Sequence, residues 1–415
     1  MGFVFPPDAG YTLKKGKRPD AFGGQVGPRA VARSGGLKKL LIFSVILVLV
    51  AVAVQAQTTV VEPEFSPMVP AMVASGGVGV AQPLGLGSLF VNPAGLATAP
   101  SAFTALSGGP ALYFLPDRTV RPYLGQLSSN PQGALAGLSP TIASNGFGGN
   151  LTVGLGYSGK GIGIGLFDVT DVYADSTQAT SQLADASNTL AFLVGIGVPI
   201  TNNLYVGGTL RPMLRIHAPS VPMVDLVEFS NGSGGSSIPV LYGFGIGLDL
   251  GLLWDMKPFT VGLSLRDIGG TQFYYSSGTL ESVLSSITSG KSLPYGTPLS
   301  SVYEVPMNVT MGVAYHPDVG RTVSIVDPRF EVDYHYAFGQ TPASPLLGLH
   351  AGADLRFLSL VDLRAGFNQG YLTFGAGIKL LFAQLDVAYF TRPGSLTGSG
   401  AAPNTGLATS LSISF

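Results

Sequence analysis

The chain has 415 residues, with 58 glycines, 30 prolines and no cysteine, and only 11% of its residues are charged. A soluble enzyme normally carries about 25% charged residues, and the absence of cysteine excludes disulfides, thiolate metal sites and cysteine nucleophiles. Glycine shows no three-residue period and 46% of the residues are hydrophobic, which excludes a collagen-like or a disordered chain.

Residues 38–56 have the form of a secretory signal peptide. Two lysines precede an apolar run over residues 40–54, and Val54-Gln55-Ala56 follows it. This run suits the h-region of a leader, whereas a membrane-spanning helix needs about 20 apolar residues. We therefore assign residues 1–56 to a leader that is cleaved after Ala56, with an uncleaved anchor as the alternative.

The part of the leader ahead of Lys38 is longer than a normal n-region, which suggests that translation begins later, at Val31 or Leu37. Removal of residues 1–56 takes away eight basic and two acidic residues and changes the net charge from −1 to −7. An acidic chain disfavours nucleic acid as a partner.

Residues 57–100 contain an apolar stretch that four turn residues interrupt, Asn92-Pro93-Ala94-Gly95. Pro93 fixes its own φ and keeps Asn92 out of the helical region, and the side chain of Asn92 is suited to bond the backbone of the following turn. The pattern predicts a compact element that satisfies its own polar groups ahead of the first strand. An ordinary surface turn is the alternative.

Beyond residue 100 the sequence alternates between apolar residues and small or polar residues, which is typical of strands with one apolar face. Residues 407–415 show the pattern clearly, with Leu407, Leu411 and Phe415 on the apolar face. About 14 such strands are predicted, at residues 101–114, 149–158, 160–171, 188–199, 202–216, 239–254, 257–267, 304–316, 325–339, 345–356, 359–367, 370–380, 382–391 and 405–415.

Long and tight connections alternate between these strands, which is typical of an outer-membrane barrel. An open sheet edge is not tolerated in hydrocarbon, so the sheet must close on itself. Aromatic residues lie where the membrane interfaces are expected, with Trp254 and Phe259 beside a tight turn and Phe415 at the end of the chain. We therefore predict an all-β fold, a transmembrane antiparallel β-barrel over residues 101–415. A soluble β-sandwich is the alternative.

The stretch from Gly76 to Ala97, followed by about 14 strands and a terminal aromatic residue, resembles the long-chain fatty acid transporter (FadL-type) family of outer-membrane proteins. The resemblance implies that residues 57–100 form an N-terminal hatch inside the barrel lumen. It places Asn92, Pro93, Ala94 and Gly95 in the hatch motif. It also implies passive uptake of hydrophobic small molecules such as long-chain fatty acids.

Two of the predicted outer loops carry apolar residues, which are natural on a protein that captures hydrophobic molecules. In the family, the corresponding loops form an outer greasy groove, while packing of the loops on each other over the barrel mouth is the alternative. The candidate capture residues are Val221, Met223, Leu226, Phe229, Leu280, Val283, Leu284 and Ile287.

The later strands place charges of both signs on their inward faces, which suits pairing that braces the wall and anchors a hatch. This polar set comprises Glu331, Asp333, His335, His350, Asp354, Arg356, Asp362, Arg364, Lys379 and Asp386. For His335 and His350 a hydrogen-bond network is the preferred interpretation over a metal site.

No nucleophile arrangement, H-E-x-x-H motif or phosphate loop is present, so we expect neither an enzyme nor a cofactor or metal site. The expected partners are a hydrophobic small molecule, outer-membrane lipid and the barrel assembly machinery, which would recognise Phe415. The oligomeric state stays open. A barrel that serves as scaffold or shuttle in a secretion or surface-attachment complex is the alternative function, and a water-filled porin ranks third.

Overall fold

The computed structural model describes residues 59–115, 118–174, 183–232, 238–294, 296–320, 325–340, 342, 344–393 and 403–415. The predicted leader and its cleavage site lie outside these ranges.

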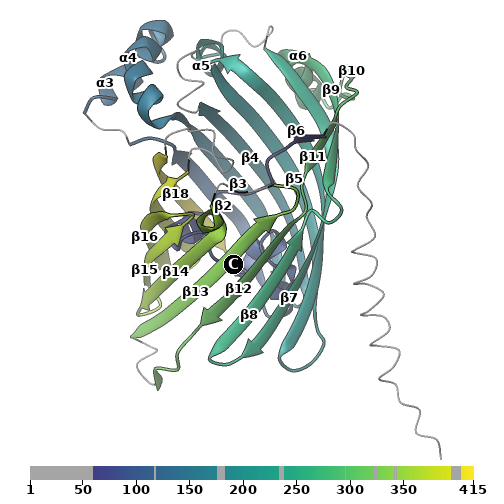
Figure 1. Ribbon diagram of the computed structural model, residues 1–415, viewed down its shortest axis with the longest axis vertical. Coiled ribbons are helices and arrows are strands. Elements are labelled where there is room, and N and C mark those ends of the chain that lie inside the picture. The colour runs from purple at the N-terminus through teal and green to yellow at the C-terminus, as the bar shows by residue number, and fades with distance from the viewer. Residues whose placement is uncertain are drawn as a thin grey trace, which may run out of the picture. The chain divides into compact units, whose positions relative to one another are not determined.

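The chain folds into a closed antiparallel barrel of fourteen strands (Figure 1). Consecutive strands pair along the chain, and the last strand pairs with the first, which closes the wall. Twelve of the fourteen are continuous: β2 (Ala102–Leu112), β3 (Phe147–Gly159), β4 (Ile162–Ala174), β5 (Leu183–Pro199), β6 (Leu204–Pro222), β7 (Pro239–Met256), β13 (Val326–Ala337), β14 (Leu349–Phe357), β15 (Val361–Asn368), β16 (Tyr371–Leu380), β17 (Ala383–Arg392) and β18 (Asn404–Ser414). The predicted fold class and strand number are confirmed.

The two remaining barrel strands are each interrupted. β8 (Phe259–Arg266) and β9 (Thr271–Thr279) both pair with β7 and form one strand with a bulge at residues 267–270. β11 (Val302–Val305) and β12 (Asn308–Tyr315) form the next one. The sequence analysis was wrong to leave residues 268–303 outside the predicted strands, because β9 lies within this range and continues the wall. Gly269-Gly270 was interpreted as a turn that ends the strand, whereas it forms a bulge.

A short strand from the N-terminus joins the wall. β1 (Thr59–Val61) pairs in parallel with β11, with Val60 opposite Tyr303. The pairing of β12 with β13 ends at Asn308 and Ala337. Beyond this point β11 has no β13 partner, and β1 pairs with it instead. A further short strand, β10 (Thr297–Pro298), pairs with β9.

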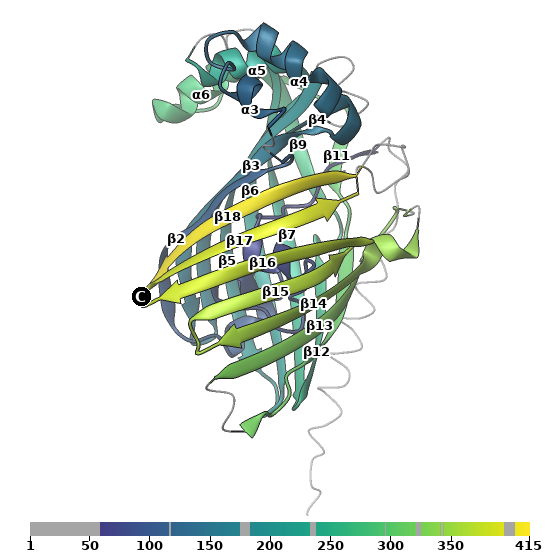
Figure 2. The same cartoon turned by 90° about the vertical axis from the view of Figure 1, so that its left-hand side faces the viewer.

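The helices of the strand connections gather at one end of the barrel (Figures 1 and 2). They are α3 (Arg121–Leu124), α4 (Pro131–Asn145), α5 (Met223–Ser230) and α6 (Leu280–Thr288), and a 3₁₀ turn, η5 (Pro345–Gly348), precedes β14. Tight turns such as residues 160–161 and 257–258 connect the strands at the other end. Within the described ranges, no helix is both long and apolar enough to cross a membrane.

The outward face of the wall is apolar, because alternate residues along each strand point away from the lumen. On β5, for example, Phe192, Val194 and Ile196 are exposed, while the alternating residues Ala191 and Leu193 are buried. Aromatic rings cluster at the tight-turn end: Phe259 stacks near Tyr315, and Phe382 lies 5.5 Å from Phe415. An apolar band bounded by aromatic residues is the surface that a barrel presents to lipid.

The N-terminal segment, residues 62–100, lies inside the barrel, where it is drawn in purple in Figure 2. It contains the helix α2 (Pro70–Ala74) and the 3₁₀ turns η1 (Gly85–Leu89) and η2 (Pro93–Ala97). Leu89 and Leu96 are fully buried and belong to a cluster with Phe167 and Leu193 of the wall. The main apolar core is therefore formed between this segment and the inner faces of β4 to β7, β9 and β11.

Candidate functional site

Asn92 joins three parts of the structure through one side chain. Its backbone is extended, with φ −155° and ψ 104°, and Pro93 opens the turn η2 that follows. Its Oδ1 accepts a hydrogen bond from the N–H of Ala94 at 3.1 Å, while its Nδ2 donates to the carbonyls of Val80 at 2.7 Å and Leu252 at 3.1 Å. The side chain is fully buried. It therefore closes its own turn, ties two stretches of the N-terminal segment together and attaches the segment to β7.

Glycines on the inner wall make room for this turn. A Cβ atom added at Gly207 of β6 would overlap the backbone of Pro93, and one added at Gly251 of β7 would overlap Oδ1 of Asn92. The neighbouring Gly208 points the other way, and a Cβ atom there would only reach ordinary contact with Leu250. The small inward residues of β6 and β7 thus shape the wall to the Asn92 turn.

Two carboxylates of β13 hold the opposite side of the segment. Oδ2 of Asp333 accepts hydrogen bonds from the N–H groups of Gly79 at 2.9 Å and Val80 at 3.1 Å. Oε1 of Glu331 accepts from the N–H of Ala81 at 2.6 Å. Because both carboxylates are buried, they satisfy backbone donors that no strand or helix would otherwise pair.

The first turn of the segment is bound to the later strands. The hydroxyl of Thr373 donates to the carbonyl of Ala74 at 3.0 Å and accepts from the N–H of Gly76 at 3.1 Å. Nδ1 of His350 lies 2.8 Å from the carbonyl of Gly76. His335 instead contacts the hydroxyl of Thr310, at 3.0 Å. Among the described residues, no three His, Asp or Glu side chains are arranged to hold a metal ion.

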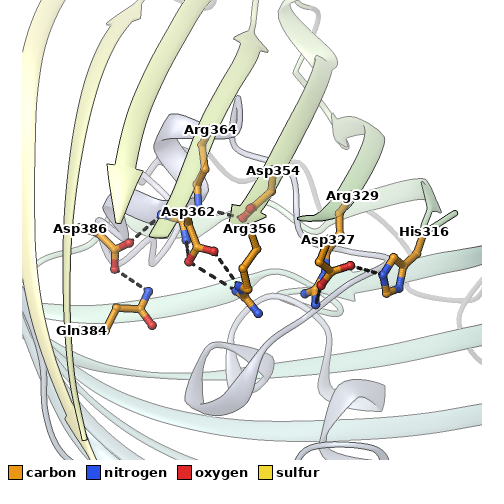
Figure 3. Close-up of polar contacts among 9 residues, drawn as sticks. All are labelled: His316, Asp327, Arg329, Asp354, Arg356, Asp362, Arg364, Gln384 and Asp386. Carbon is orange, nitrogen blue, oxygen red and sulfur yellow. Dashed lines mark hydrogen bonds and ion pairs between the residues drawn. The ribbon is translucent and has the colours of Figure 1, made fainter. Parts of the chain in front are cut away.

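The remaining charges of β14 to β17 pair with one another across the wall (Figure 3). Arg364 is 4% exposed and reaches Asp354 at 2.9 Å, Asp362 at 2.7 Å and Asp386 at 2.6 Å. Nε of Arg356 contacts Asp362 at 2.6 Å. These neighbouring strands are therefore joined by ion pairs as well as by their backbone ladder. Lys379 of the predicted set lies exposed on β16 and takes part in none of these pairs.

Among the described residues, two cavities of the lumen border the N-terminal segment on opposite sides. The upper cavity, on the side of the helices, has a volume of about 550 Å³ and is lined by the start of the segment and by β11 to β13. The lower cavity has about 580 Å³ and is lined by η1, by some of the charged residues of Figure 3, among them Arg356, Arg364 and Asp386, and by serines of β18. Met68 borders both cavities. The segment thus stands between two spaces of similar size.

Two arginines of the wall face two glutamates of the segment. Nη1 of Arg215 on β6 lies 3.0 Å from Oε2 of Glu62 and also donates to the carbonyl of Pro63 at 3.0 Å. Arg266 on β8 lies 3.5 Å from Oε2 of Glu64 and donates to the carbonyl of Phe65 at 2.5 Å. The sequence analysis did not single out these residues.

A third arginine of the wall forms the most buried ion pair of this region. Arg211 of β6, with no exposed surface, contacts Asp249 of β7 and lies 2.6 Å from Asp267 in the bulge. Arg211 and Arg215 alternate with apolar Leu210 and Leu214, so the two-residue period would have placed both arginines inward. Their carboxylate partners lie on β7, in the bulge and in the N-terminal segment, and the sequence pattern does not identify them.

The predicted capture residues are mostly covered. Val221 and Val283 are buried in one cluster under α6, and Met223 is buried in another with α4. Leu226, Leu280 and Leu284 are half-buried, while Phe229 and Ile287 are exposed. The burial of Val221, Met223 and Val283 favours the alternative in which the loop helices pack on each other and on the barrel rim, and the capture role of the whole set stays a prediction.

A family model described as "F plasmid transfer operon, TraF, protein" matches residues 242–324. Comparison with curated proteins finds no match.

Solved structures similar to this chain include the toluene transporter TbuX of Ralstonia pickettii, at 13% identity and a TM-score of 0.47, over 84% of this chain and 98% of that one. The CymD monoaromatic hydrocarbon channel has 14% identity and a TM-score of 0.47, over 84% and 97%. A FadL homologue of Pseudomonas aeruginosa has 12% identity and a TM-score of 0.44, over 87% and 99%. Similarity at this level does not assign a substrate to the chain.

Proposed function

We propose that the chain is an outer-membrane channel for the passive uptake of hydrophobic small molecules, with long-chain fatty acids as the first candidates. In this proposal residues 62–100 are a plug that prevents free passage of water and polar solutes. Phe229 and Ile287 would offer exposed apolar contacts near the mouth. The apolar outer band of the barrel supports insertion in a membrane.

The observation that carries the proposal is the division of the lumen. A segment tied to the wall by Asn92, Glu331 and Asp333 lies between two cavities of the described lumen, and this arrangement supports a plugged channel over a general porin with an open pore. The upper cavity is lined in part by apolar side chains, among them Phe65, Val169 and Val305. Its volume lies within the about 300–1,000 Å³ of sites that enclose small molecules.

Uptake by cells tests this function. A strain without the gene and the same strain carrying it are given radiolabelled oleate, and their initial rates of oleate uptake are compared. Equal abundance of a control porin in the two outer membranes ensures that the membranes are otherwise alike. We expect the rate to rise when the protein is present. Equal rates in the two strains would contradict the proposal.

A role as scaffold or shuttle in a surface complex is the second candidate, and the family match over residues 242–324 favours it. That range contains β8, β9, α6 and β12, so it lies in the barrel itself. Purification in mild detergent separates the two functions. A channel should be recovered without other proteins, whereas a scaffold should bring partner proteins in fixed ratio.

A further inference from the structure

Two neighbouring turns at the tight-turn end of the barrel are apolar. Residues 358–360 join β14 to β15, and residues 381–382 join β16 to β17. Leu358 is 67% exposed and Leu381 is 93% exposed, so neither side chain is buried by the protein itself. Together with the exposed apolar residues beside them they form what we call the apolar rim, which comprises Leu358, Leu360, Leu380, Leu381, Phe382 and Phe415.

The apolar rim is one continuous surface. The carbonyl of Leu360 accepts a hydrogen bond from the N–H of Lys379 at 2.8 Å, which places the first turn beside Leu380 at the end of β16. The rings of Phe382 and Phe415 stack with their centres 5.5 Å apart, which joins the second turn to the end of β18. In Figure 2 these strands lie on the near side of the barrel, with the C-terminus beside the turns.

The two leucines occupy a backbone conformation that does not favour leucine. Leu358 and Leu381 both have φ +51°, in the left-handed region where a Cβ atom is crowded and where glycine or asparagine is common. Within the part of the chain that the structure describes, the other non-glycine residues with positive φ are polar: Lys160, Ser220, Asp267, Ser359 and Gln369. Turn formation alone therefore does not favour these leucines, whereas contact with an apolar environment does.

The turns on the opposite side of the barrel are polar at the same end. Lys160, Asn202 and Lys257 are exposed in the turns that follow β3, β5 and β7. The apolar rim is therefore a feature of one side of the barrel and not of its whole circumference.

The strands above the apolar rim are also short. β15 has 8 residues, β16 and β17 have 10 each, and the polar turn Gln369-Gly370 joins β15 to β16 at their other end. At about 3.3 Å per residue and a tilt of about 40°, 8–10 residues rise about 20–25 Å, which does not exceed the apolar band of about 25 Å of an outer-membrane barrel. With the polar turn at one membrane surface, the apolar turns therefore remain within the opposite surface.

We propose that the apolar rim inserts into the periplasmic leaflet of the outer membrane, with Leu358 and Leu381 as anchors at the boundary between head groups and acyl chains. Lipid is the occupant because the rim continues the lipid-facing band, in which Leu372, Phe374 and Ile378 of β16 are exposed ahead of Leu380. The inference rests on the proposed function and adds a membrane anchor on one side of the barrel. The polar turns of the other side remain in water.

Nitroxide labels in nanodiscs of phosphatidylethanolamine and phosphatidylglycerol test the proposal. Single cysteines for labelling are introduced as Leu358→Cys, Leu381→Cys and Asn202→Cys, and the chain has no cysteine of its own. Val194→Cys, on the outward face of β5, serves as the reference for a position in the apolar band. Collisions of each label with oxygen, which concentrates in lipid, and with a water-soluble nickel complex give its depth.

We expect the labels at positions 358 and 381 to lie about 5–10 Å below the head groups, the depth that interfacial apolar surfaces reach, and the label at position 202 to lie in water. A further label at Leu360→Cys measures what the leucines contribute. It should move toward water in Leu358→Asn/Leu381→Asn, because asparagine keeps the left-handed turns but loses the apolar contact. Lys160→Asn makes the same kind of change in a turn of the polar side, at φ +54°, and should leave this label in place.

Two results would overturn the inference and leave the proposed function intact. Labels at positions 358 and 381 in water, with the label at position 194 in lipid, would mean that the apolar rim is open to a periplasmic protein and not covered by lipid. An unchanged depth of the label at position 360 in the asparagine variant would mean that the leucines are not anchors. A label at position 194 in water would instead show that the barrel is not in the membrane, and would remove the proposed function together with the inference.

Discussion

At the scale of single residues, Asn92 shows what a side-chain amide contributes to the plug. It makes three hydrogen bonds in a position without solvent, so Asn92→Ala leaves the carbonyls of Val80 and Leu252 without this donor. We expect a cost of about 1–3 kcal/mol to the attachment of the plug. The barrel, held by its closed ladder, should still assemble and keep its heat-modifiable migration on gels.

The measurement for Asn92→Ala is planar-bilayer conductance, with Asn203→Ala in the exposed tight turn of β5 and β6 as the matched control. The variant should show open events that are rare in the unchanged protein and in the control. Identical conductance in all three proteins would mean that Asn92 does not hold a plug.

Glu62 gives the N-terminal segment a dependence on pH. Burial disfavours its charged form, but the nearby His217, 3.6 Å away, and the charge of Arg215 outweigh burial and lower the pKa of the Glu62 carboxyl below its usual value. Tyr275 is the other titratable group near it. A lowered pKa means that the contact stabilises the folded segment above about pH 4.3 and that this stabilisation is lost as the pH falls through the lowered value.

A nitroxide spin label attached through Val61→Cys measures this effect, and the chain carries no other cysteine that would react. It should stay immobile from pH 7 to about pH 4.5 and become mobile only at lower pH. In the Glu62→Gln/Glu64→Gln background its mobility should change little over the same range. A label that becomes mobile near neutral pH would show that a group other than Glu62 controls the attachment of the segment.

The side-chain pattern predicted which residues face the lumen better than it predicted their partners. Alternation placed Glu331 and Asp333 inward, because a strand has a strict period of two. Their bonds to the backbone of residues 79–81 join positions about 250 apart in the sequence, and no local pattern contains that information. Glu62 and Arg215 were missed for the same reason.

At the scale of elements, the wall and the plug are matched by small residues. Gly207→Ala places a methyl group against Pro93, whereas Gly208→Ala on the same strand places one toward the outside. We expect Gly207→Ala to cost about 1–3 kcal/mol through overpacking and to loosen η2, with little effect from Gly208→Ala.

Conductance and protease sensitivity of residues 62–100 in detergent compare this pair of variants. Equal behaviour of Gly207→Ala and Gly208→Ala would show that the wall does not constrain the Asn92 turn.

The strands were predictable because each carries its own alternation, and their ends differ from the structure mostly by a few residues. β9 was missed because a bulge at Gly269-Gly270 separates it from β8. β1 was missed because three residues are too few to show a period, and its parallel pairing with β11 depends on where the chain enters the barrel.

At the scale of the whole molecule, the closed wall surrounds the internal segment, and the two cavities lie beside that segment in the lumen. The apolar band requires lipid outside, and closure removes the edges that lipid does not tolerate. Closure was predictable from the sequence because it follows from this requirement, and the strand count was predictable because each strand carries its own alternation. The cavities were not, since their size depends on how the segment packs against every strand.

The central claim is that hydrophobic molecules cross this barrel while polar solutes do not. Its most direct test is the ratio of uptake rates for labelled oleate and a labelled disaccharide in cells with and without the protein. We predict that the protein raises the oleate rate and leaves the disaccharide rate unchanged, so the ratio increases. An unchanged ratio, whether both rates rise as through a water-filled porin or neither rises, would contradict the account.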